Sequence, residues 1–143
     1  MKNIKFLLIA AIAIMPSLLM AQTASYTLSG KVGQLSAPAK AYLMYSNTAG
    51  RQTDSTAISN GAFTFAGTID EPKSAYLIVS KSGNGVRSKD AHYIDLYLEA
   101  GNISVVSPDS IDNAKVTGGP VNADNAKLNL ALKIGRASCR ERV

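Results

Sequence analysis

The sequence predicts an all-β fold, an antiparallel β sandwich or partly open barrel of about seven to eight strands with a short C-terminal helix. Between Tyr26 and Ser107, apolar and polar residues alternate in short runs, which is the period-two pattern of half-buried strands. Turn-forming Gly, Pro and Asn residues separate these runs. The strongest turn signal is Asn60-Gly61, because this pair tolerates the positive φ angles of a type I′ hairpin turn.

The expected strands follow one another from the alternation in each run. The strand after the Asn-Gly turn places Phe63 and Phe65 on one face. Two large rings need a second layer to cover them, so we expect this hairpin at the centre of the core. We expect strands at residues 26–32, 40–46, 52–59, 62–66, 75–80, 93–99 and 103–107.

Two elements have a distinct pattern. Residues 75–80 form a continuous apolar run, which predicts a strand buried on both sides. Helical spacing appears only near the end, where Asn122 is expected to cap a helix over residues 123–132.

The first 21 residues predict a signal peptide that precedes the fold. Lys2 and Lys5 give a basic start, residues 6–20 are mostly apolar, and Ala21 is a small residue before cleavage at Gln22. The alternative is a retained membrane anchor, although this run contains a proline and is shorter than the roughly 20 residues of a membrane-spanning helix. We therefore expect localisation to the periplasm or cell envelope, with no stable membrane span after cleavage.

Residues 134–143 do not belong to the natural protein in our interpretation. Residues 134–143 resemble, at every position, the translation of a common sequencing-library adapter, with a genuine basic tail as the alternative. We expect the natural gene to be interrupted at about Lys133. Residues 22–121 would then be the β domain, and residues 122–133 the start of a linker helix to a missing domain.

Charge and cysteine content narrow the function classes. Of the net charge of +5, the predicted signal peptide contributes +2 and residues 134–143 another +2, which leaves +1. This near-neutral remainder predicts no nucleic-acid partner. Cys139, the only cysteine, lies in the terminal segment. Residues 22–133 therefore have no thiol for a disulfide, a metal site or nucleophilic catalysis.

The candidate chemical motifs are weak. Gly83-Asn84-Gly85 lacks the third glycine and the following helix of a dinucleotide-binding loop, so a mobile loop is the expected alternative. His92 has no second histidine or nucleophile motif around it, and we expect it at the surface. Asp95 and Glu99 share a strand face but lie far apart, which favours solvent-facing charges. We therefore predict no catalytic, cofactor-binding or metal-ligating residue, and no enzyme activity for this fragment.

Tyrosines and two Asp-Ser motifs leave further alternatives open. The chain has six Tyr and no Trp, and Tyr can form a glycan-binding face or pack within a sheet, the latter being the favoured interpretation. Asp54-Ser55-Thr56 and Asp109-Ser110-Ile111 resemble an acceptor pattern for O-glycosylation in bacterial envelopes, or Asx-type turns. The tyrosines expected on strands are Tyr42, Tyr45, Tyr76, Tyr93 and Tyr97.

Several short motifs recur in an order that is typical of a known family. They are Gly30, Asp54-Ser55, the run from Gly61 through Phe63 and Phe65 to Gly67, Glu71-Pro72, residues 76–79 and residues 113–118. Over residues 26–132 the chain resembles the uncharacterised N-terminal β domain of secreted bacterial thioredoxin-like thiol–disulfide oxidoreductases. These enzymes are of the type related to alkyl hydroperoxide reductase and thiol-specific antioxidant proteins.

The resemblance implies a non-catalytic accessory domain with a positioning or docking role. Its expected partner is a C-terminal thioredoxin-like domain with a Cys-x-x-Cys motif, which is absent from this sequence, so no redox residue is transferred. The alternative is a stand-alone envelope binding module for a glycan or peptide, which would use the tyrosines or an open sheet edge.

Overall fold

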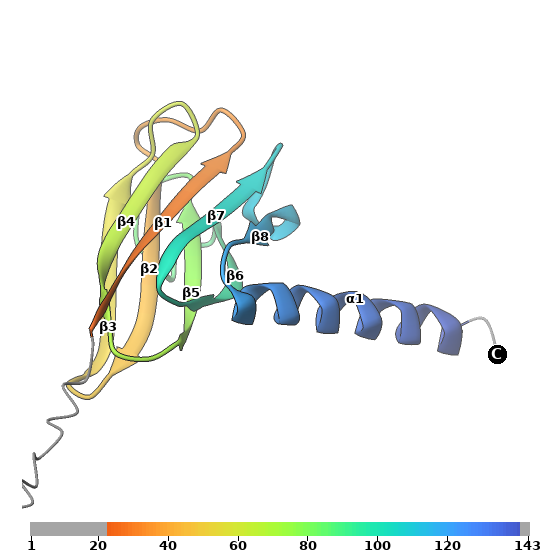
Figure 1. Ribbon diagram of the computed structural model, residues 1–143. Helices are drawn as coiled ribbons and strands as arrows, with labels where there is room; N and C mark the ends of the chain where they lie inside the picture. Colours follow the sequence, from red (N-terminus) through yellow and green to blue (C-terminus); the bar gives the residue numbers. More distant parts are fainter. Residues whose placement is uncertain (1–22, 141–143) are drawn as a thin grey trace, which may run out of the picture.

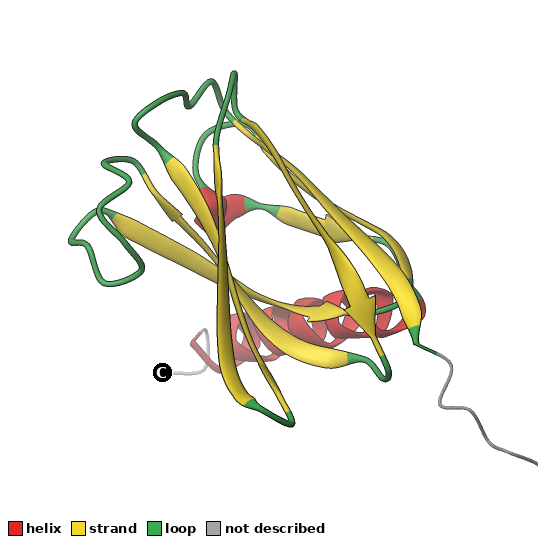
Figure 2. Cartoon of the chain, turned by 90° about the vertical axis from the view of Figure 1, so that its left-hand side faces the viewer, coloured by secondary structure: helices red, strands yellow, loops and turns green. Residues whose placement is uncertain are grey.

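The computed structural model describes residues 23–140 and shows two sheets facing each other, with one helix outside them (Figures 1 and 2). The predicted signal peptide lies outside the described residues. The strands are β1 (Ala24–Val32), β2 (Lys40–Asn47), β3 (Gly50–Ala57), β4 (Ala62–Ile69), β5 (Lys73–Ser80), β6 (Ala91–Leu98), β7 (Gly101–Ser107) and β8 (Lys115–Thr117). The helices are the 3₁₀ turn η1 (Ile111–Asn113) and α1 (Pro120–Arg140).

Each sheet has four strands. Their orders are β4-β1-β7-β8 and β3-β2-β5-β6, and every pair is antiparallel except β1 and β7, which run parallel. The described strands therefore form an open two-layer sandwich and no closed barrel. This confirms the predicted fold class and strand number.

The core lies between the sheets and contains the predicted aromatic pair. Phe63 and Phe65 are 5% and 7% exposed, and their rings meet edge to face with centroids 6.1 Å apart. Phe63 lies opposite Gly30 on β1, where a Cβ atom would be only 1.9 Å from the ring. The glycine thus makes room for the ring across the strand pair. Tyr26 similarly covers Gly67.

The Asn60-Gly61 turn forms, but the hairpin prediction is wrong. Both residues have positive φ, 50° and 77°, and the backbones of Ser59 and Ala62 exchange two hydrogen bonds of 2.9 and 3.0 Å. Beyond this point the chain changes sheets, because β3 pairs with β2 whereas β4 pairs with β1. Ile58 is buried and donates its N–H to Ala39, which keeps the preceding segment beside β2. The turn is a corner between two sheets.

Strand β5 and helix α1 also differ in detail from what the sequence predicts. In β5, residues 77–80 are buried on both faces as predicted, but Tyr76 is exposed. The helix α1 has 21 residues and begins at Pro120, before the predicted start. Within residues 23–140, no helix is both long enough and apolar enough to cross a membrane.

Candidate functional site

The outer face of the β2-β5-β6 sheet carries most of the tyrosines. Strand register places on this side Tyr42, Met44, Tyr76, Ile78, Tyr93 and Tyr97, a surface that we call the tyrosine face. Tyr45 points to the opposite side, where it packs against the core. The favoured interpretation, packing within the sheet, does not account for Tyr76 and Tyr93, which are 44% and 63% exposed.

The loop of residues 81–90 folds over one end of the tyrosine face. The Tyr42 hydroxyl donates a hydrogen bond to the Gly83 carbonyl at 2.8 Å. Ile78 is only 5% exposed although it points away from the core. Val86 in the loop lines a depression beside Ile78. The Gly83-Asn84-Gly85 loop is thus followed by strand β6, as expected for a segment that is not a dinucleotide-binding loop, and the backbone of Gly83 lies against its own sheet.

Asp90 organises this loop. Its carboxylate accepts hydrogen bonds from the Ser82 N–H at 2.6 Å and the Ser82 hydroxyl at 2.8 Å. These bonds favour the ionised form and hold the pKa of Asp90 well below its usual range. The hydroxyls of Ser80 and Ser88 lie 2.9 Å apart beneath it. The loop therefore has a specific internal framework.

Two depressions meet at Tyr76. One, of about 330 Å³, is lined by Met44, Tyr76, Ile78, Val86, Ala91 and Tyr93. The other, of about 520 Å³, is more polar and is lined by Ser46, Asn47, Thr48, Glu71, Lys73, Ser74 and Tyr76. The rings of Tyr76 and Tyr93 are edge to face, with centroids 5.9 Å apart. The arrangement can hold an apolar group beside a hydrogen-bonding one.

A second cluster attaches α1 to the end of β6. The carboxylate of Glu99 accepts hydrogen bonds from the backbone N–H groups of Val121 at 3.1 Å and Asn122 at 2.9 Å. It also accepts one from the Asn122 side chain at 2.8 Å. The first turn of a helix has N–H groups without partners inside the helix and a partial positive charge. A carboxylate at this position accepts hydrogen bonds from those N–H groups and interacts favourably with the charge. We call Glu99, Gly119, Val121 and Asn122 the helix root.

The Asn122 side chain completes the helix root on the strand side. Its Nδ2 donates to the Tyr97 carbonyl at 2.7 Å, and its Oδ1 accepts from the Tyr97 N–H at 3.0 Å. The side-chain amide of Asn122 thus bonds to both backbone groups of Tyr97, as the backbone of a neighbouring strand would. Gly119 allows the approach, because a Cβ atom there would lie 1.9 Å from Glu99.

These contacts correct two predictions. Glu99 is 3% exposed and does not face solvent, and Asn122 lies inside the helix and does not cap it. Both side chains are hydrogen-bonded across more than 20 residues of sequence, which local patterns do not reveal. The sequence signal that was available is Pro120 after two glycines, because proline is favoured at the first helical position.

The remaining candidate residues are dispersed. His92 is exposed, and its Nδ1 lies 2.7 Å from an Asp112 carboxylate oxygen. Asp95 is exposed on the tyrosine-face side of β6, whereas Glu99 is buried and bonded to the first turn of α1, so the two carboxylates have different environments. Among the side chains that the structure describes, those of residues 23–134, no three His, Cys, Asp or Glu side chains lie close enough together to hold a metal ion. Cys139 lies beyond the side chains that the structure describes.

The two Asp-Ser motifs have different environments. Ser55 is exposed on the edge strand β3. Ser110 donates its N–H to Asp109 at 2.6 Å and its hydroxyl to Asp112 at 2.9 Å. The hydrogen bond from the Ser110 N–H lowers the pKa of Asp109, with a further contribution from Asn113. The second motif is thus part of a hydrogen-bonded turn.

A family described as "Domain of unknown function (DUF4369)" matches residues 26–125. No curated protein sequence matches the chain. A solved structure described as "Trapped Toxin" has 13% identity and a TM-score of 0.35, over 66% of this chain and 22% of that one. Another, "Crystal structure of the human-specific toxin intermedilysin", has 13% identity and a TM-score of 0.29, over 71% and 24%. The chain spans less than a quarter of either structure, and at these scores the likeness carries no argument.

Proposed function

The chain belongs to the DUF4369 family, a domain of unknown function, and on that premise we propose that it is a non-catalytic accessory domain of an exported thiol–disulfide oxidoreductase. Its role would be to position the catalytic domain or to dock a partner. The ordered motifs from Gly30 to Gly118 support the link to such enzymes. The observation that carries the positioning role is the helix root.

The helix root gives α1 a defined direction. Glu99 and Asn122 are 3% and 2% exposed, and both take part in hydrogen bonds between the end of β6 and the first turn of α1. Beyond this turn α1 leaves the sandwich (Figure 1). A domain that followed α1 would therefore start from a point and direction that the sandwich sets.

The decisive experiment is to sequence the genomic locus across and beyond the codon for Lys133. A thioredoxin-like domain with Cys-x-x-Cys in the same reading frame would support the proposal. A stop codon close to that position would contradict it. The export component is tested by mass spectrometry of the periplasmic fraction, which should find an N-terminus at or close to Gln22. An intact Met1 end in the membrane fraction would favour an anchor instead.

The second candidate function is a stand-alone envelope module that binds a glycan or a peptide. The tyrosine face favours it, because two exposed aromatic rings border adjoining apolar and polar depressions. Exposed aromatic side chains of this kind are enriched where proteins bind other molecules. A stop codon after residue 133 would leave this function as the better candidate.

A further inference from the structure

The walls of the smaller depression favour an apolar side chain over a sugar. Four of the six lining residues, Met44, Ile78, Val86 and Ala91, are apolar, so the hydroxyls of Tyr76 and Tyr93 are the hydrogen-bonding side-chain groups of the lining. The neighbouring Tyr42 hydroxyl is already bonded to the Gly83 carbonyl. A sugar ring carries several hydroxyls that each need a partner, whereas a leucine or phenylalanine side chain needs none. The volume of about 330 Å³ is at the small end of the range for ligand pockets, and it leaves room for a leucine or phenylalanine side chain.

The two exposed tyrosines provide the contact surface for that side chain. Tyr76 and Tyr93 remain 44% and 63% exposed, although they contact each other edge to face. Tyrosine rings give a large apolar contact at a low cost in side-chain entropy, and they dominate binding energy in many protein interfaces. Met44 adds a flexible wall that adapts to different apolar side chains.

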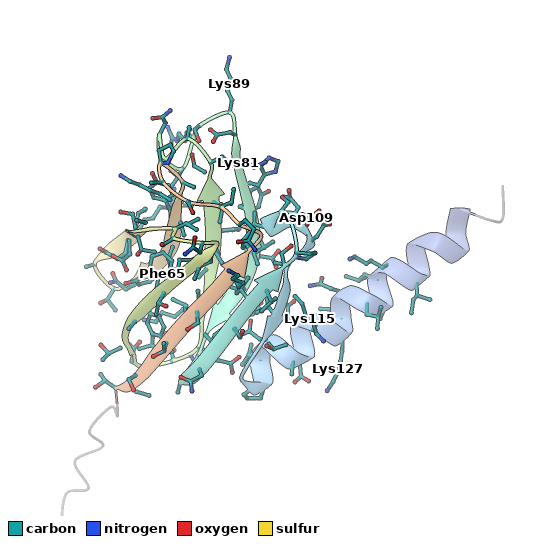
Figure 3. The ribbon with its side chains drawn as sticks, turned by 90° about the horizontal axis from the view of Figure 1, so that it is seen from above. Phe65, Lys81, Lys89, Asp109, Lys115 and Lys127 are labelled. Carbon is teal, nitrogen blue, oxygen red and sulfur yellow. The ribbon has the colours of Figure 1, made fainter. Side chains whose placement is uncertain are left out.

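Positive charge on the loop of residues 81–90 indicates which residues of the ligand flank its apolar side chain. Within residues 81–90, Lys81, Arg87 and Lys89 are exposed, and Figure 3 shows Lys89 projecting outward at this end, away from α1. Asp90, the only acidic residue of the loop, is engaged by Ser82. Lys40 lies alongside Gly83 on the same side. Asp95, opposite Tyr76, is an exposed acidic residue on the same face, so the excess of positive charge is confined to the loop end. We call Lys40, Lys81, Arg87 and Lys89 the basic rim, and a surface of this charge attracts negatively charged residues.

We infer that the smaller depression, on the part of the tyrosine face around Tyr76 and Tyr93, docks an extended polypeptide segment that presents one large apolar side chain flanked by acidic residues. The apolar side chain occupies the depression that Tyr76 and Tyr93 line together with Met44 and Ile78, and the acidic residues lie against the basic rim. The inference rests on the second candidate function and narrows its ligand to a polypeptide. It is compatible with the accessory role, because the partner that an accessory domain docks can itself be a polypeptide.

The test uses the full chain and a fluorescein-labelled nonapeptide with a central leucine between pairs of aspartates, titrated by fluorescence anisotropy. We expect saturable binding with a dissociation constant below about 1 mM. Replacing the leucine by alanine, or the aspartates by lysines, should weaken binding about tenfold. Saturable binding of the neutral glycan maltohexaose at Tyr93, with none of the peptide, would overturn the inference, and so would binding of neither probe.

Variants locate the site. Tyr93→Ser should weaken peptide binding about tenfold, and Arg87→Glu should weaken it most at low salt. Tyr97→Ser is the matched control, because Tyr97 is on the same face of β6 but does not line the depression. Equal loss in Tyr93→Ser and Tyr97→Ser would refute the assignment to this depression. The genomic sequence beyond the codon for Lys133 tests the accessory role alone, whereas the binding assay tests the docking of a polypeptide. Each proposal can therefore fail without the other.

Discussion

The helix root makes a quantitative prediction for Glu99→Ala. The substitution removes three hydrogen bonds, from the Val121 N–H, the Asn122 N–H and the Asn122 side chain. Asn122 Nδ2 keeps its bond to Tyr97, and the half-buried Val121 N–H can reach water. The buried Asn122 N–H is left without a partner, which costs about 1–3 kcal/mol.

Loss of the carboxylate from the helix N-terminus adds about 0.3–2 kcal/mol. The free energy of unfolding should therefore fall by about 1–5 kcal/mol. At about 4 °C per kcal/mol for a domain of this size, the Tm should fall by about 5–20 °C. Differential scanning calorimetry measures this shift. Amide hydrogen exchange at residues 121 and 122 shows whether α1 detaches before the sandwich unfolds.

Two variants control for other effects of the substitution. Glu71→Ala removes an exposed carboxylate and should change the Tm little. Glu99→Gln keeps one acceptor oxygen but loses the charge, so its Tm should lie between those of the wild type and Glu99→Ala. If Glu99→Ala melted like Glu71→Ala, with unchanged exchange at residues 121 and 122, the proposed attachment of α1 would be refuted.

Four other predictions test the core, the corner turn, a buried tyrosine and the absence of redox chemistry. Phe65→Ala should lower the free energy of unfolding by about 3–5 kcal/mol in urea titrations, and an unchanged midpoint would contradict its place in the core. Gly61→Val should also destabilise, because a Cβ atom there would lie 2.2 Å from the Gly33 carbonyl oxygen and valine resists positive φ; an unaltered melting curve would count against the turn. Burial raises the pKa of Tyr26 to about 12, with smaller contributions from Tyr45 and Asp54, so the unfolded state loses this proton first and stability should fall as the pH rises from about 10 to about 12. Tyr26→Phe should flatten that part of the pH profile, and an identical profile would show that another group is responsible. Residues 22–133 should neither reduce insulin disulfides nor oxidise a dithiol peptide, because they contain no cysteine; multiple-turnover exchange would refute the accessory role.

Alternation within strands was predictable because it depends on burial of every second residue. The pattern of residues 40–46 placed Tyr42 and Met44 opposite Leu43 and Tyr45, and the structure has them on those faces. Phe63 and Phe65 were placed in the core for the same reason. A period of two is a local property, so neighbouring residues are sufficient to establish it.

Pairing between distant segments was not predictable from local pattern. The Asn60-Gly61 turn has the expected dihedral angles, yet these angles do not determine which strands the flanking segments pair with. Glu99 follows an alternating strand and carries a charge, so exposure was the default expectation. Its burial depends on N–H groups more than 20 residues away, which supply the partners that a buried carboxylate requires.

The two candidate functions meet on strand β6. Tyr93 borders the apolar depression, and the backbone of Tyr97 holds the Asn122 side chain at the helix root. Four residues of strand separate these positions, about 13 Å. A polypeptide docked beside Tyr93 would therefore lie at a fixed, short distance from the start of α1. The proposed docking and positioning roles would then both depend on strand β6, and the genomic locus decides whether a catalytic domain follows α1.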